Sequence, residues 1–255
     1  MALLETEQVT KKFGGVTAVK SISLTVDGGE IIGMIGPNGS GKSSFINLLS
    51  GVYKPDMGRI IFEGEDITNL PSHIITRKGI ARTFQNLRVF SNISVLDNLL
   101  IGRHCKINNS LFNVYLNPLA SKKIEKDSEV SVCSLLAMVD LSDRMDDFAR
   151  NLSYGAQRLL EICRALASEP KLLLLDEPCA GMNPSEVESL GVFLKGLQKG
   201  GTTIFIIEHN MKFIMSIADR IIVLNAGEKF REGIPAMIQS DKQVQKIYLG
   251  EEEEG

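Results

Sequence analysis

The sequence predicts an α/β protein with a mostly parallel sheet. Three observations support this class: compact apolar runs typical of buried strands, helical patterns that alternate with those runs, and a glycine-rich loop that joins one such strand to a helix. Repeated βα alternation brings strands together in parallel and covers both faces of the sheet with helices. The 255 residues, 44% of them hydrophobic, suffice for one large domain or two closely packed subdomains.

The first predicted elements are short and rich in β-forming residues. Residues 8–10 are one such run, and residues 21–26 alternate apolar and polar side chains as a half-buried strand does. A compact apolar strand at 30–35 then leads through the glycine-rich loop to a helix at 43–50. The apolar side chains of this helix recur at helical spacing, and it is expected to end near Gly51.

The C-terminal half repeats the strand and helix pattern. Buried strands are predicted at 171–175, 202–207 and 220–224, with helical segments such as 184–197 between them. Each strand is therefore expected to lie parallel to the strand at 30–35 in one sheet.

The strand signal fades in the middle of the chain, where the sequence predicts a helical block. Residues 94–97 resemble a capping box, and apolar side chains at five positions fall on one helical face. These positions are Ile124, Val132, Leu135, Leu136 and Val139. Residues 104–118 are rich in Asn and Ser and are predicted to form a loop or an irregular insertion within the block.

Charge and cysteine content exclude several classes of protein. The net charge of -3 argues against a mainly electrostatic nucleic-acid binder, which carries a basic face. The four cysteines form no CxxC pair and no metal-like group with the three histidines, which favours reduced, cytosolic thiols over zinc or disulfides. With no secretory signal and no run of about 20 apolar residues, the chain is predicted to be cytoplasmic, and any membrane attachment must come from a partner.

The glycine-rich loop satisfies the pattern GxxxxGK[ST] and lies between a strand and a helix, as phosphate-binding loops do. Backbone N–H groups can curl around phosphates there, Lys42 can reach the β- and γ-phosphates, and the Ser43 hydroxyl can bind Mg²⁺. The alternative is a tight glycine turn without a ligand. The residues of this phosphate loop are Gly36, Pro37, Asn38, Gly39, Ser40, Gly41, Lys42 and Ser43.

Two adjacent carboxylates follow the four leucines of the strand at 171–175. Asp176 is predicted to hold Mg²⁺ directly or through water, and Glu177 to polarise the attacking water as a general base. An acidic strand end on its own can be a solvated loop start. The phosphate loop in the same chain favours the catalytic interpretation.

A further segment, LSYGA at residues 152–156, lies ahead of this acidic strand and opens a helical stretch. It resembles the LSGGQ signature of ABC-type ATPases, with Tyr154 in place of a glycine and Ala156 in place of the glutamine. In that family the signature serine and its helix N-terminus reach the ATP held by the opposite subunit of a head-to-tail dimer. The resemblance assigns this role to Ser153 and to the amide of Gly155.

Other positions match the family in order and spacing. Gln85 resembles the glutamine that senses the γ-phosphate, Mg²⁺ and water, His209 the switch histidine, and Phe13 the aromatic that stacks on adenine. Residues 180–183 occupy the D-loop, with Asn where Asp is usual. Each also has an ordinary alternative: a surface glutamine, a satisfied polar histidine, a core phenylalanine.

The resemblance thus implies a set of site residues for ATP and Mg²⁺. The catalytic residues are Glu177, His209, Lys42 and Gln85. The nucleotide contacts come from Phe13, the phosphate loop, Ser44, Ser153 and Gly155. The Mg²⁺ ligands are Ser43, Gln85 and Asp176.

The resemblance covers nearly the whole chain and extends to its architecture. It implies a P-loop NTPase core at about 1–86 and 160–250, with an antiparallel β subdomain at the N-terminus. A helical subdomain is inserted at about 87–159, and residues 251–255 form an acidic, solvated tail. Together residues 1–250 make one ATPase domain.

Within the family the sequence is most similar to ATP-binding subunits of branched-chain amino-acid importers. The strings that carry this likeness are ARTFQNLRVF, LSYGAQR, EPCAGMNP, IEHNM and the late YLG. The expected function is ATP hydrolysis that powers solute import, with a second ATPase subunit in a homo- or heterodimer. Permease subunits and, indirectly, a solute-binding protein are the other expected partners, with the chain peripheral on the inner face of the cell membrane.

Other functions remain open alternatives. Related ABC systems serve urea, short amides or lipopolysaccharide export. A soluble ABC-type ATPase usually carries two cassettes or a long coiled coil, and a small-molecule kinase would not explain the signature-like segment. A nucleotide-gated regulatory module would not need Glu177.

Overall fold

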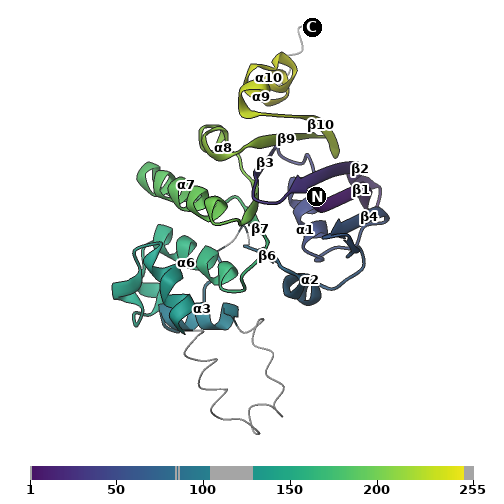
Figure 1. Cartoon of the computed structure of the whole chain (residues 1–255). Helices are drawn as coiled ribbons and strands as arrows, with labels where there is room; N and C mark the ends of the chain where they lie inside the picture. The colour runs from purple at the N-terminus through teal and green to yellow at the C-terminus, as the bar shows by residue number, and fades with distance from the viewer. Residues whose placement is uncertain (1, 84, 86, 104–128, 250–255) are drawn as a thin grey trace.

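The computed structural model describes residues 2–83, 85, 87–103 and 129–249 of the chain (Figure 1). The predictions for residues 104–118, Ile124 and the acidic tail lie outside this part. None of the helices in the described residues is long and apolar enough to cross a membrane.

The strands form two sheets, and the first is a small antiparallel sheet in the order β2-β1-β4-β5. Its strands are β1 Ala2–Phe13, β2 Val16–Asp27, β4 Met57–Phe62 and β5 Glu65–Asp66. This agrees with the antiparallel N-terminal region that the family resemblance implies. β1 is far longer than the run predicted at 8–10, because hydrogen bonds to β2 on one side and β4 on the other sustain it through polar positions.

The second sheet has six strands in the order β10-β9-β3-β8-β7-β6, and only β10 is antiparallel to its neighbour. Its strands are β3 Ile31–Ile35, β6 Ile80–Arg82, β7 Leu172–Asp176, β8 Thr203–Ile207, β9 Arg220–Asn225 and β10 Glu228–Gly233. The mostly parallel α/β sheet is therefore confirmed. β6 and β10 were not predicted, because β6 is three residues long and β10 is largely exposed, so neither has an apolar pattern.

Helices connect and cover the strands. They are α1 Lys42–Leu49, α2 Ser72–Lys78, α3 Val95–Arg103, α6 Tyr154–Leu166, α7 Pro184–Lys199, α8 Met211–Ile217, α9 Pro235–Ser240 and α10 Lys242–Leu249. Residues 129–137 are also helical, and short 3₁₀ turns lie at Ser142–Arg144 and Ala149–Asn151. The predicted helices at 43–50 and 184–197 are confirmed within about two residues, the usual scatter of helix ends.

The helical block is also confirmed in its described part. Ser94 caps α3, its hydroxyl accepting the Asp97 N–H at 2.9 Å. Val132 and Leu136 are fully buried in the core under the large sheet, and Leu135 and Val139 pack against the same core. Val132, Leu135 and Leu136 share one face of the helix at 129–137, as their spacing predicted, whereas Val139 lies in the turn that follows this helix.

The six-stranded sheet separates two hydrophobic cores. Ile31 and Ile35 of β3 point into the core beneath α6, α7 and α8, and Ile32 and Met34 point into the core shared with α1 and the antiparallel sheet. Figure 1 shows the small sheet and α1 on one side of the large sheet and α7 on the other. Burial on both faces explains the unbroken aliphatic runs in these strands.

Strand order decides where the functional loops meet. The parallel strands β3, β8 and β7 are neighbours, so their carboxyl ends share one edge of the sheet. The phosphate loop follows β3, Asp176 ends β7 and Glu177 follows it, and His209 lies two residues after β8. Segments far apart in the sequence are thereby gathered at one edge, where ligands bind in open α/β sheets.

Candidate active site

The phosphate loop has a backbone that only glycine allows at two of its positions. Gly41, immediately before α1, has a φ of 102°, and a Cβ there would lie 2.2 Å from the carbonyl oxygen of Ala18. A Cβ on Gly36 would lie 2.2 Å from the carbonyl oxygen of Leu224. The glycines thus let the loop approach β2 and β9 closely, which fixes the start of α1.

Lys42 lies against the loop that precedes it. Its Nζ donates to the carbonyls of Gly36 at 2.8 Å and Pro37 at 2.9 Å, and the residue is buried. Burial lowers the pKa of this ammonium, while the nearby charges of Glu177 and Asp176 oppose the shift. The free amides at the start of α1 and this cation together fit the phosphates of a nucleotide.

Asp176 is buried at the tip of β7, and its two carboxylate oxygens differ in their surroundings. Oδ2 accepts a hydrogen bond from Arg82 at 3.0 Å, whereas Oδ1 is buried and has no hydrogen-bond partner among the described residues. Burial raises the pKa of the carboxyl, and Arg82 opposes this rise. An orphaned buried carboxylate oxygen is a fitting ligand for a hard cation such as Mg²⁺.

Arg82 is a site residue that the sequence reasoning missed. Its guanidinium also donates to Asn47 Oδ1 at 2.6 Å and Ser50 Oγ at 3.0 Å, both on or next to α1. Arg82 therefore ties the helix after the phosphate loop to the acidic end of β7. Arg82 ends the short strand β6, which pairs with β7. The sequence does not reveal this three-residue strand, so it gives no sign that Arg82 lies next to Asp176.

Glu177 brings two of the predicted catalytic residues together. Its Oε1 lies 3.0 Å from His209 Nε2, and its Oε2 accepts from Gln85 Nε2 at 3.2 Å. Glu177 adopts a left-handed backbone with φ 50°, a strained conformation for a residue with a side chain and one that clusters at functional sites. In this arrangement the Gln85 amide faces Glu177, so its role as a Mg²⁺ ligand stays a prediction.

Glu208 is a second site residue that was missed. Its buried carboxylate accepts the backbone N–H groups of Cys179 at 2.7 Å, His209 at 2.9 Å and Asn210 at 3.1 Å. It therefore joins the segment after Glu177 to the segment that carries His209. The available signal was an acidic residue at the end of an apolar strand, the same signal that identified Asp176 and Glu177.

The signature-like segment begins α6. Ser153 is the N-cap and its hydroxyl accepts the N–H of Ala156 at 3.3 Å, which satisfies one free donor of the helix. The Tyr154 ring packs over Gly181, where a Cβ would lie 2.8 Å from the ring. A tyrosine at 154 is thus accommodated by a glycine in the predicted D-loop.

Gly155 also packs closely against a neighbour, because a Cβ there would lie 2.3 Å from Oε1 of Glu186. No hydrogen bond in the described part of the chain joins Ser153 or Gly155 to the chain's own phosphate loop. The structure therefore does not unite these two predicted nucleotide contacts with the other half of the site within one chain.

Phe13 ends β1 and is 41% exposed, so the alternative of ordinary core packing is wrong. Its ring centroid lies 5.2 Å from that of Tyr53, with the rings edge to face, and Lys11 Nζ lies 5.7 Å from it. An exposed aromatic pair offers a surface for a planar base, and Tyr53 is an addition that the sequence did not indicate. Contact of Phe13 with adenine stays a prediction.

A family model described as ABC transporter matches residues 19–180, more than half of the chain. The chain belongs to the ABC transporter family. It is 40% identical over 251 residues to the high-affinity branched-chain amino acid transport ATP-binding protein BraF of Pseudomonas aeruginosa, with 98% of each chain covered. It is 38% identical over 250 residues to LivG of Escherichia coli, described in the same words, again with 98% of each covered.

Solved ABC cassettes have the same fold. The ADP conformation of MJ1267, an ATP-binding cassette of an ABC transporter, superimposes with a TM-score of 0.86 at 36% identity, covering 98% of this chain and 100% of that one. The dimeric structure of MJ0796, a bacterial ABC transporter cassette, gives 0.77 at 25% identity, covering 91% and 98%. This ABC protein is accordingly an ATPase.

Several polar groups in the site of this ABC ATPase have partners within the chain. Lys42 contacts its own loop, Asp176 contacts Arg82, and Glu177 contacts both Gln85 and His209. The predicted contacts of Lys42 and His209 with the nucleotide stay predictions, since both side chains have partners within the chain in this arrangement.

Proposed function

We propose that this ABC ATPase hydrolyses ATP·Mg²⁺ in a head-to-tail dimer and thereby powers the import of branched-chain amino acids through a membrane permease. The observation that carries the catalytic part is the contact of Glu177 with both Gln85 and His209, beside Asp176 and at the edge of the sheet where the phosphate loop also lies. A general base, two polar groups for the γ-phosphate and a phosphate cradle are the parts that phosphoryl transfer needs.

In the proposed mechanism, Lys42 leaves the carbonyls of Gly36 and Pro37 and donates to the β- and γ-phosphates. Ser43, Asp176 and Gln85 would hold Mg²⁺, which would neutralise part of the charge on the phosphates. Glu177 exchanges its contacts with Gln85 and His209 for the attacking water and accepts its proton. His209 then donates to the transferring phosphoryl group, where its charge develops.

The site is completed by a second subunit. Ser153 is exposed at the start of α6, away from hydrogen-bonding contact with its own phosphate loop, which supports its use on the nucleotide of a facing chain. The relative MJ0796 is a dimer. Closure of two subunits on two nucleotides is the step coupled to transport, and hydrolysis reopens the pair.

The catalytic assignment is tested by Glu177→Gln. We expect ATP to bind normally and hydrolysis to fall by roughly 10²- to 10⁴-fold, the range typical of a lost general base. Glu63→Gln is the matched control, because Glu63 has the same left-handed backbone, with φ 50°, and among the described residues its carboxylate pairs only with Lys171, on the surface. A Glu177→Gln protein that hydrolyses ATP as fast as its parent refutes the assignment.

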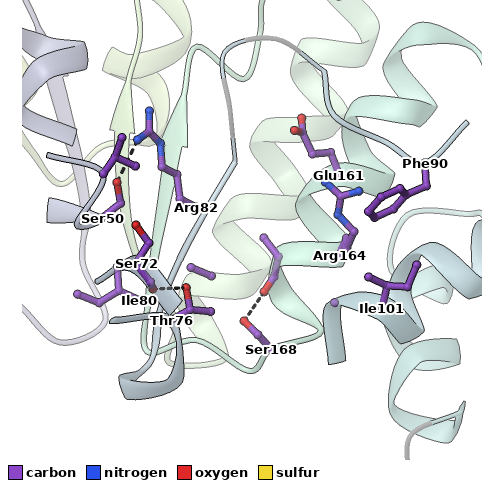
Figure 2. Close-up of a pocket in the computed structure, with 14 residues that line it drawn as sticks. Ser50, Ser72, Thr76, Ile80, Arg82, Phe90, Ile101, Glu161, Arg164 and Ser168 are labelled. Carbon is purple, nitrogen blue, oxygen red and sulfur yellow. Dashed lines mark hydrogen bonds between the residues drawn. The ribbon is translucent and has the colours of Figure 1, made fainter. Parts of the chain in front are cut away.

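The permease is proposed to dock in the groove between α2, α3 and α6 (Figure 2). This groove has a volume of about 340 Å³ and is lined by the exposed apolar side chains of Phe90 and Ile101. Of the neighbouring apolar residues Leu87, Val89 and Phe90, only Phe90 lines the groove, and Val89 packs against the core.

The docking proposal is tested by Phe90→Ser, which we expect to lower permease-stimulated hydrolysis more than basal hydrolysis. Phe148→Ser is its control. Phe90 and Phe148 are 50% and 47% exposed, and an arginine lies over each ring, 5.1 Å and 4.9 Å away, but Phe148 does not line the groove. Equal losses of basal and stimulated activity in Phe90→Ser contradict docking at this surface.

The transported solute is inferred from BraF and LivG, whose described role is branched-chain amino acid transport. Reconstitution with candidate permeases distinguishes this proposal from urea, amide or lipopolysaccharide systems. We expect leucine and its binding protein to stimulate hydrolysis, and stimulation by one of the other solutes instead refutes the proposal. In this role the protein works in the cytoplasm, peripheral to the inner face of the membrane, with its helical subdomain at about 87–159 against the permease.

A further inference from the structure

Arg158 of α6 is a charged residue with no exposed surface. Its Nη1 donates to Glu161 Oε2 at 2.9 Å, one helical turn further along α6, and Glu161 is itself 2% exposed. A buried ion pair is costly to desolvate, and a pair of apolar side chains of similar size often gives a fold that is at least as stable. The pair therefore calls for an explanation other than stability.

The second guanidinium nitrogen of Arg158 reaches the two residues that meet at the candidate catalytic centre. Nη2 donates to the backbone carbonyl of Gln85 at 3.0 Å and to that of Glu177 at 3.3 Å. Gln85 and Glu177 are 92 positions apart in the chain, and their side chains are joined by a hydrogen bond of 3.2 Å. One buried cation thus holds both backbones where the two side chains touch.

Two further side chains of α6 contact residues near the proposed docking groove. Glu161 Oε1 accepts the N–H of Arg88 at 3.2 Å, and Arg164 donates to the Arg88 carbonyl and lies 5.1 Å from the ring of Phe90. Figure 2 shows Glu161, Arg164 and Phe90 together at the groove. Side chains three residues apart on α6 therefore contact Gln85 at the catalytic centre and Arg88 and Phe90 near the groove.

We propose that Arg158 is a positioning residue that fixes the Gln85 and Glu177 backbones relative to each other and anchors both to α6, the helix that Ser153 caps. This inference rests on the proposed function, in which Gln85 and Glu177 act in hydrolysis. Its physical basis is that a guanidinium presents several donors in a fixed plane, so it can hold two carbonyls and a carboxylate at once. A displacement of about 1 Å in such a centre is enough to slow a reaction strongly.

The test uses two variants of Arg158. Arg158→Met/Glu161→Gln removes the guanidinium without leaving a buried carboxylate, and the glutamine can still accept from Arg88. Arg158→Lys keeps a donor at the same place. The control is Arg144→Met/Asp147→Asn, which removes another ion pair of the same i,i+3 spacing whose printed hydrogen bonds reach neither Gln85 nor Glu177.

Hydrolysis, ATP affinity and thermal unfolding are measured for each protein. For Arg158→Met/Glu161→Gln we expect kcat to fall about 10- to 100-fold, with ATP affinity unchanged because the phosphate loop is intact. Arg158→Lys should recover part of kcat, and the control should retain the parental value. Adding Gln85→Ala should slow the double variant less than it slows the parent, because Gln85 is already displaced in the double variant.

Three results overturn the inference: a parental kcat in the double variant, a loss of kcat matched by an equal loss of ATP affinity and folded protein, or equal kcat losses for the lysine and methionine variants. The proposed function fails in a different way. It fails if the parent protein hydrolyses no ATP or if Glu177→Gln is fully active, whatever the Arg158 variants do.

Discussion

The ion pair between Arg82 and Asp176 leads to a quantitative prediction for Arg82→Met. The two side chains are 10% and 3% exposed, and their atoms Nη2 and Oδ2 are 3.0 Å apart. Methionine preserves most of the volume of the arginine but removes the cation, which leaves the Asp176 carboxylate buried without its partner. Breaking a buried pair in this way costs about 3–5 kcal/mol of the free energy of unfolding.

For a chain of this size, 1 kcal/mol shifts Tm by about 2–4 °C. Arg82→Met should therefore unfold roughly 6–20 °C below the parent protein at neutral pH. Lys171→Met is the control. Lys171 and Glu63 form an ion pair of 2.5 Å between side chains that are 57% and 41% exposed, and such surface pairs contribute about 0–1 kcal/mol. Its Tm should fall by no more than about 4 °C.

The deficit of Arg82→Met should also depend on pH. Burial raises the pKa of Asp176 in the folded state, and Arg82 partly opposes this rise, so its removal raises the pKa further. With a raised folded pKa the folded state binds more protons than the unfolded state, and stability falls as pH rises above the ordinary value of 3.8. The difference in Tm between variant and parent should thus be largest at neutral pH and shrink on acidification.

Thermal unfolding followed by circular dichroism across pH, without nucleotide, measures these differences. Adding Asp176→Asn to Arg82→Met should recover most of the lost Tm, because no unpaired charge remains. Equal Tm values for Arg82→Met and Lys171→Met, or a deficit that does not change with pH, would refute the argument that Asp176 depends on Arg82 for its buried charge.

Three further predictions follow from the geometry. Gly41→Ala and Gly201→Ala both place a side chain at positive φ, 102° and 93°, which costs about 1–2 kcal/mol of stability. Only the alanine at position 41 also meets a backbone carbonyl, so Gly41→Ala should lose more free energy of unfolding in urea than Gly201→Ala. Gly41→Ala should also lose ATP binding. Burial raises the pKa of Cys163 to about 12 and raises that of Cys179 as well, so mass spectrometry should find neither thiol alkylated at pH 8 until the protein unfolds. Asn183→Ala removes the capping box of α7 and should lower stability by about 1 kcal/mol in the same urea assay, whereas an unchanged midpoint contradicts a capping role.

Much of the fold could be predicted because its signals are local. The central strands carry unbroken aliphatic runs, since both of their faces are buried, and α1 and α7 begin and end at recognisable residues. The antiparallel sheet gave weaker signals. β4 begins with the exposed residues Met57, Gly58 and Arg59, and its pairing with β1 rather than its own pattern makes it a strand.

The sequence by itself determined the phosphate loop and the acidic pair at 176 and 177, because each is a contiguous motif whose chemistry depends on residue type and local backbone. Only the tertiary structure decided what these groups contact. Arg82 reaches Asp176 across 94 positions, and Arg158 reaches Gln85 across 73. Such contacts depend on strand order and on how α6 packs against the sheet, and no local pattern records either, because long-range packing is fixed by the whole chain.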